Sequence, residues 1–147
     1  MTTVRVSVDV LRELQDTCTI TMAVYGESDD ADVQRYLEPQ RVVQFAGNRI
    51  GLIHGHQAEP ESWWRRLLRM GPARDAEATR RGVLAAFEGV SCIVYGHTHR
   101  PYARMHGGVL LFNPGPAAPL DGQRPSVGIL EIDAHSIAGR IVYLDEV

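Results

Sequence analysis

The sequence predicts an α/β domain with a ligand site at one edge of its sheet. Short apolar runs rich in β-branched residues, typical of strands, alternate with segments whose apolar residues recur at helical spacing. Two of those runs, at 50–53 and 92–95, are each followed by two histidines separated by one residue. In open α/β sheets ligands bind outside the carboxyl ends of the strands, so the histidines mark where a site is expected.

Length and composition indicate one globular domain with a core. The chain has 147 residues, 44% of them hydrophobic, and a net charge of −3. That charge gives no electrostatic case for nucleic-acid binding, which usually needs a basic face. No apolar run approaches membrane-spanning length, no signal peptide is evident, and Cys18 and Cys92 lie in strand-like apolar surroundings. We therefore expect a cytoplasmic protein with free thiols and no membrane contact.

The N-terminal part is predicted to hold a helix and then a strand. Ser7 is a candidate N-cap for a helix over 7–14, whose apolar residues lie at positions 8, 11 and 14. Residues 19–25 alternate in the manner of a strand, which Gly26 ends.

The acidic turn at 26–30 has two interpretations. Asp29 or Asp30 could cap a helix over 32–37, because carboxylates at a helix N-terminus accept hydrogen bonds from its first amides. The turn would then be an ordinary connection. Its place after a predicted strand equally allows it to contribute to a site.

A β-hairpin is predicted next, with strands at 41–45 and 49–53 around the turn Ala46-Gly47-Asn48. The segment 62–70 alternates apolar and basic residues as an amphipathic helix does. Its apolar stripe either packs into the core or forms a subunit contact or a lid, since tryptophan and arginine are enriched at interfaces. A second helix is predicted over 75–88.

The C-terminal half is predicted to be mostly β-structure. Ser91 begins a buried central strand, and hairpins follow at 102–105 with 109–112 and at 127–132 with 139–144. His106 and His135 fall in the two hairpin turns, and we interpret them as turn residues. The other four of the six histidines lie at the two strand ends.

Four motifs, taken in order, resemble the calcineurin-like metallophosphoesterase superfamily. They are Val-Tyr-Gly-x-x-Asp at 24–29, His-Gly-His at 54–56, Gly-His-Thr-His at 96–99 and Asn-Pro-Gly at 113–115. The small prokaryotic phosphodiesterase branch, which shares its fold with the retromer scaffold subunit, is the part of the superfamily that the chain resembles. The resemblance runs from about Val10 to the C-terminus and implies a two-sheet sandwich flanked by helices.

The resemblance implies roles for the strand-end histidines. His99 would bind one metal ion, and His54 and His97 the other, while His56 is the candidate catalytic residue. Two such ions make a hydroxide at neutral pH and clamp the phosphoryl group during in-line attack.

The chain departs from the family pattern in its carboxylates. The Asp-x-His near the N-terminus and the later Gly-Asp, which supply metal ligands in the family, are missing. We therefore expect the domain, over 1–147, to be N-terminally incomplete and to lack the first strand of the fold. Glu27 stands where the family has an asparagine ligand, and Ser28 where it often has a catalytic histidine or cysteine.

Fewer carboxylates predict fewer metal ions. Two divalent cations held close together repel each other and need anionic ligands between them, which neutral imidazoles do not provide. We expect at most one ion, bound by His54, His97, His99 and Glu27. Three imidazoles and one carboxylate suit manganese, zinc or iron.

Two functions remain open at this point. The first is a metal-dependent phosphoesterase, a hydrolase of phosphorylated small molecules that is weak or inactive as this chain. The second is a non-catalytic binding or scaffold module with the same fold. Without its first strand, the sheet is expected to leave an edge or apolar face exposed, which favours a homodimer.

Overall fold

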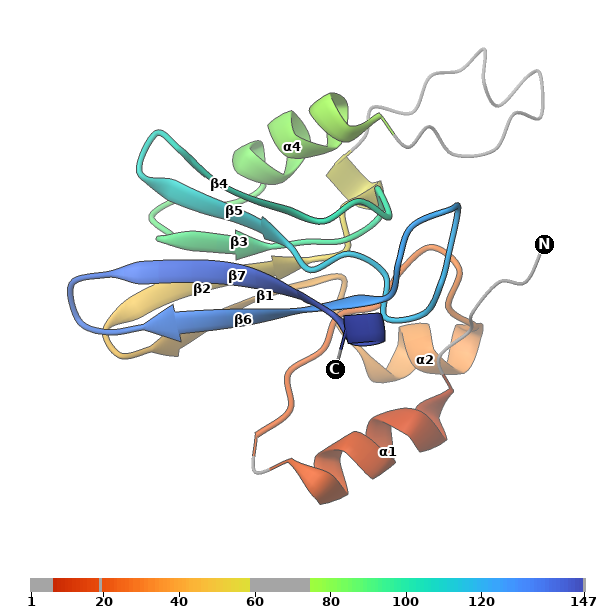
Figure 1. Cartoon of the computed structure of the whole chain (residues 1–147). Helices are drawn as coiled ribbons and strands as arrows, with labels where there is room; N and C mark the ends of the chain where they lie inside the picture. The colour runs from red at the N-terminus through yellow and green to blue at the C-terminus, as the bar shows by residue number, and fades with distance from the viewer. Residues whose placement is uncertain (1–6, 19, 59–74, 147) are drawn as a thin grey trace, which may run out of the picture.

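A computed structural model describes residues 7–18, 20–58 and 75–146, and these form three layers (Figure 1). A five-stranded sheet in the order β1-β2-β3-β5-β4 is the middle layer. Helix α4 lies on one face of this sheet and the β6–β7 hairpin on the other. The two-sheet sandwich flanked by helices, which the family resemblance implies, is confirmed.

The β1–β2 hairpin forms where the sequence predicts it. Strand β1 (Gln40–Phe45) pairs antiparallel with β2 (Asn48–Ile53). Ala46 and Gly47 between them have φ angles of 48° and 80°. Two left-handed residues in succession match the twist of the flanking strands, which is why a glycine is favoured here.

The centre of the sheet is parallel. Strand β3 (Cys92–Val94) lies between β2 and β5 (Val109–Asn113) and runs parallel to both. Strand β4 (Tyr102–His106) pairs antiparallel with β5 at the far edge. His106 therefore ends a strand and does not lie in the turn, and its Nε2 atom is 2.8 Å from the Tyr102 hydroxyl.

Alternating side chains of the central strands fill two cores. Ile93 and Leu111 face α4, while Cys92, Leu110 and Phe112 face the β6–β7 hairpin. All five side chains are buried. Because successive residues of a strand point to opposite faces, this alternation places an apolar layer on each side of the sheet.

The second sheet packs closely on the first. It consists of β6 (Ser126–Ile132) and β7 (Ile137–Tyr143), a hairpin that the sequence predicts. A Cβ atom at Gly139 would come within 2.7 Å of the Phe112 ring. The glycine thus allows the Phe112 ring to lie directly against the strand backbone. A 3₁₀ turn, η2 (Leu144–Glu146), follows β7.

The described residues include three α-helices. Helix α1 is Val8–Thr17, α2 is Ala31–Tyr36 and α4 is Ala76–Ala85. Asp30 caps α2 by accepting from the amides of its second and third residues, as the sequence predicts, and Asp75 caps α4 in the same way. None of the described helices is long and apolar enough to cross a membrane.

The strand predicted at 19–25 is wrong. The described part of this segment, 20–25, forms only an isolated bridge between Val24 and Glu38. Ile20 is 73% exposed and Met22 47% exposed. Alternation alone does not make a strand, because its backbone also needs a neighbouring strand to pair with. The helix predicted at 62–70 lies outside the described residues.

Candidate functional site

The parallel strands β2 and β3 bring two of the predicted site histidines together. His54 follows β2, and His97 follows β3 in the turn after Gly96. The Gly96 amide donates to the His54 carbonyl oxygen at 2.9 Å, which continues the pairing of the strands beyond their ends. The two imidazole ring centroids lie 5.6 Å apart.

His56 joins them from the 3₁₀ turn η1 (His56–Ala58), which begins two residues after His54. Its ring centroid lies 5.2 Å from that of His54 and 6.5 Å from that of His97. The Nδ1 atoms of His54 and His56 are 3.1 Å apart. One of them must carry a proton and the other a lone pair, so both rings can be satisfied while neutral.

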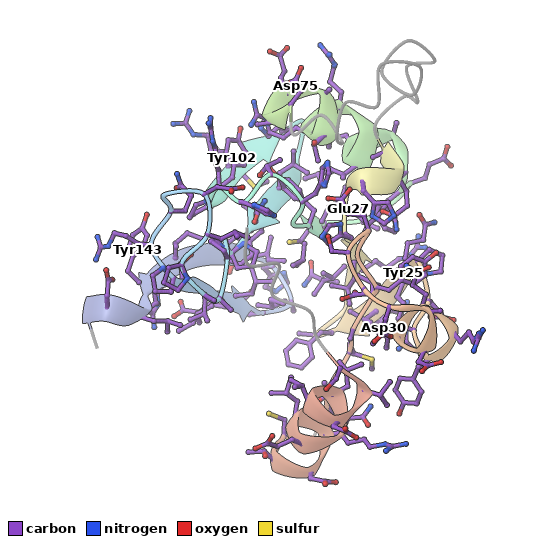
Figure 2. The ribbon with its side chains drawn as sticks, turned by 90° about the vertical axis from the view of Figure 1, so that its right-hand side faces the viewer. Tyr25, Glu27, Asp30, Asp75, Tyr102 and Tyr143 are labelled. Atoms are coloured by element: carbon purple, nitrogen blue, oxygen red, sulfur yellow. The ribbon has the colours of Figure 1, made fainter. Side chains whose placement is uncertain are left out.

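A carboxylate closes this group of rings. Glu27 Oε1 lies 3.1 Å from His97 Nδ1, and the His97 side chain is fully buried. Because an ionised carboxylate only accepts, Nδ1 of His97 donates and its Nε2 atom carries the lone pair of the neutral ring. Figure 2 shows Glu27 beside η1, with Tyr25 and Asp30 on the same N-terminal segment. We call His54, His56, His97 and Glu27 the histidine cluster.

The turn that carries Glu27 is held against the rings. A Cβ atom at Gly26 would lie 2.9 Å from two atoms of the His54 ring, so only glycine fits without displacement. The Gly26 amide donates to Asp29 Oδ2 at 2.7 Å. The interpretation of Asp30 as the cap of α2 is confirmed, and Glu27 of the same turn contacts His97. The contribution of the turn to a functional site stays a prediction.

Burial keeps His56 neutral. Desolvation lowers the pKa of His56 below its ordinary value of 6.5, and the positive charge that His97 can carry adds to this. The Glu27 and Asp29 carboxylates act in the opposite direction but more weakly than burial. At pH 7 His56 is therefore an uncharged imidazole, the form that accepts a proton or binds a metal ion.

A buried asparagine fixes the turn that carries His97. Asn113 is 1% exposed, and its side-chain amide donates to the Gly96 carbonyl and to Thr98 Oγ1, each at 3.0 Å. His97 and His99 both have left-handed backbones, with φ angles of 64° and 56°. The Asn113 bonds hold this uncommon conformation in place.

His99 contacts a different carboxylate. Its Nδ1 atom lies 2.7 Å from Asp121 Oδ2, and the residues are 22 positions apart. Sequence reasoning did not include Asp121 in the site. The Asp-Gly pair at 121–122 is a turn signal that could have drawn attention to it.

No metal site is already formed among the described residues. In the stretches 7–18, 20–58 and 75–146, no group of three or more His, Cys, Asp or Glu side chains is arranged to hold one. The Nδ1 atoms of His54 and His56 face each other, and Nδ1 of His97 faces Glu27. The assignment of His54, His97, His99 and Glu27 as ligands stays a prediction.

The chain as a whole matches a known protein family and curated relatives. The calcineurin-like phosphoesterase superfamily domain matches residues 4–135. Phosphodiesterase YfcE of Escherichia coli K12 is 29% identical over 134 residues, which cover 87% of this chain and 61% of the relative. A probable metallophosphoesterase of Methanothermobacter thermautotrophicus is 27% identical over 139 residues, or 92% of this chain and 69% of the relative.

Solved structures share the fold. A Thermotoga maritima protein, solved by NMR, superposes with a TM-score of 0.60 and 25% identity, covering 94% of this chain and 74% of its own. Vps29 of Entamoeba histolytica, crystallised with zinc, superposes with a TM-score of 0.62 and 24% identity, covering 92% of this chain and 75% of its own.

Proposed function

Because the chain belongs to the calcineurin-like phosphoesterase superfamily, we propose that it binds phosphodiesters at the histidine cluster and hydrolyses them slowly. The observation that carries this proposal is the convergence of His54, His56, His97 and Glu27 at the carboxyl ends of β2 and β3. Similarity to a phosphodiesterase favours diesters over monoesters as the substrate class.

Slow turnover follows from the few carboxylates in the cluster. A divalent ion supplies Lewis acidity and lowers the pKa of water, and two ions are needed to hold a hydroxide between them. Glu27 already contacts His97, and Asp29 accepts from the Gly26 amide. We therefore propose that the chain binds no more than one divalent ion, of which manganese, zinc and iron suit imidazole and carboxylate ligands.

The chain's own residues supply proton transfer and orientation. A neutral His56 can accept a proton from water near pH 7, because its pKa lies below the ordinary value. Glu27 holds the His97 ring with Nε2 as its lone-pair atom. These roles do not depend on the number of ions bound.

Hydrolysis of bis(p-nitrophenyl) phosphate with added manganese tests the proposal. We expect a slow rate that falls at least about ten-fold in His56→Ala, as general-base contributions of that size or larger predict. The matched control is His135→Ala, on the exposed β6–β7 turn, which should retain the rate. The second cluster variant is Glu27→Gln. We choose it over a substitution of His97, because the His97 side chain is fully buried and its removal would disturb the packing.

The proposal fails if the wild-type rate equals that of buffer with manganese. It also fails if His56→Ala and Glu27→Gln both retain the full rate. Circular dichroism of each variant distinguishes loss of function from loss of fold.

One feature of the surface favours the alternative of a non-catalytic binding module. Helix α1 stands apart from the sheets and leaves large apolar side chains exposed, including Val10 and Leu14, with Ile20 and Met22 following it. Exposed apolar surface of this kind favours association, here with a second copy of the chain. Light scattering that shows a dimer in a protein without hydrolysis would favour this function, and a monomer would count against it.

We also propose a cytoplasmic location. Both cysteines are free thiols, which agrees with this proposal.

A further inference from the structure

We infer that Asp121 is a positioning residue for the site, because it fixes the ring orientation and the tautomer of His99. The inference deepens the proposed function and rests on it in one respect, namely that His99 contacts the ligand. The orientation of the ring is independent of whether the chain turns over a substrate.

The inference starts from one short contact. His99 Nδ1 and Asp121 Oδ2 are 2.7 Å apart. Aspartate is ionised at neutral pH and only accepts, so Nδ1–H of His99 is the donor. In the neutral ring, the lone pair is then on Nε2. The His99 side chain is 19% exposed, so it is not closed off from solvent.

The segment that presents Asp121 is a tight turn. Asp121 and Gly122 have φ angles of 50° and 74°, and both are left-handed. Leu120 and Gln123 bond to each other across this turn, with N–O distances of 3.3 and 2.8 Å. Aspartate followed by glycine suits two left-handed residues in succession, because aspartate tolerates this conformation better than most residues and glycine has no Cβ.

The rest of the loop is anchored on both sides of the turn. The Ser126 amide donates to the Pro116 carbonyl at 2.8 Å, and the Ser126 hydroxyl donates to the Pro114 carbonyl at 2.7 Å. The Arg124 guanidinium binds both carboxylate oxygens of Asp145 at 2.6 and 2.7 Å. These contacts anchor the loop that presents Asp121, whose own side chain is 44% exposed.

The backbone that carries His99 is also fixed. Thr98 is 6% exposed, and its hydroxyl oxygen accepts from the Asn113 amide at 3.0 Å. A donor on a fixed backbone loses less entropy when it bonds, which favours one orientation of the His99 ring against Asp121. A carboxylate behind an imidazole is a common way to orient the atom that meets a ligand.

Glu27 and Asp121 make the same kind of contact with a histidine ring. Each accepts from Nδ1 of a histidine in the Gly-His-Thr-His motif and leaves Nε2 with the lone pair. The two carboxylates come from opposite ends of the chain. The motif fixes the positions of the rings, and the carboxylates fix which nitrogen of each ring carries the lone pair.

Long-range ¹H–¹⁵N NMR of the full chain at about pH 9, where histidine is neutral, tests the inference. His99→Ala identifies the His99 signals. The wild-type protein is expected to show a protonated Nδ1 and a lone pair on Nε2 at His99. In D121A the lone-pair signal should shift from Nε2 toward Nδ1, whereas D121N, whose amide oxygen still accepts, should keep the wild-type pattern. The matched control is D16N, an exposed aspartate on α1, which should leave His99 unchanged.

A wild-type His99 with its proton on Nε2 would overturn the inference without any variant, so failure of D121A to fold does not leave it untested. An unchanged His99 tautomer in folded D121A would overturn it as well. In the hydrolysis assay, D121A should lower kcat about ten-fold or more and D121N less. If the wild-type chain shows no turnover, the proposed function fails while the tautomer measurement still decides the role of Asp121.

Discussion

The contact between His56 and His54 is sensitive to pH. It comes from the same short segment as His54, and their Nδ1 atoms lie 3.1 Å apart. If both rings gained a proton on Nδ1, no acceptor would remain between them. Acidification should therefore disrupt this contact before it affects the hydrogen bonds made by carboxylates.

The pH dependence of folding stability tests whether acid disrupts the contact between His54 and His56. The folded pKa of His56 lies below 6.5, so the unfolded chain binds more protons and stability falls as the pH drops below about 6.5. Three aspartates also have lowered pKa values, but from an ordinary value of 3.8: Asp75, Asp133 and Asp145. The stability that these carboxylates contribute is therefore lost only below about pH 3.8. Urea unfolding at pH values between about 7.5 and 5 therefore measures the histidine contribution to stability separately from that of the aspartates.

His56→Gln should reduce the loss of unfolding free energy between those two pH values. His135→Gln, at an exposed turn, is the control and should keep the wild-type loss. An equal loss in wild type and His56→Gln would show that His56 is not the group responsible.

At the level of elements, the contact between α4 and η1 places His56. A Cβ atom at Gly82 would lie 2.5 Å from Ala58 Cβ and would overlap the Ala58 carbonyl oxygen. The helix therefore needs a glycine in its interior, although glycine weakens a helix by about 1 kcal/mol relative to alanine. Close approach of η1 to α4 outweighs that cost.

Gly82→Ala should lower the free energy of unfolding by more than about 2 kcal/mol, because backbone of η1 has to move to relieve the overlap. Gly47→Ala provides a comparison, since nothing lies within 4 Å of its added Cβ and only the positive φ is strained. We expect about 1 kcal/mol there. Urea unfolding of both variants measures the difference, and a Gly82→Ala protein as stable as wild type would contradict the packing.

The elements differ in how far the sequence determines them. The Ala46-Gly47 turn and the Asp30 cap follow from local chemistry, and both are predicted correctly. Residues 20–25 have strand alternation without a strand, because pairing depends on residues far away in the chain. The contact between His99 and Asp121 spans 22 positions and was missed for the same reason.

For the whole molecule, the sheet order explains why two separate motifs form one cluster. Strands β2 and β3 are parallel neighbours, so the residues after them meet at one edge. Strand ends and histidine spacing predicted this edge, and the parallel pairing makes His54, His56 and His97 neighbours. The carboxylate partner of His97 could not be predicted, because Glu27 reaches the cluster from a turn 70 positions away in the chain.

Elemental analysis of the metal-loaded chain tests most directly that the histidine cluster is a site with too few carboxylates for two ions. After loading with manganese or zinc and desalting, we expect no more than about one equivalent per chain, and less in Glu27→Gln than in His135→Ala. Two retained equivalents that are lost in Glu27→Gln and kept in His135→Ala would contradict this, since they would require further carboxylate ligands at the cluster.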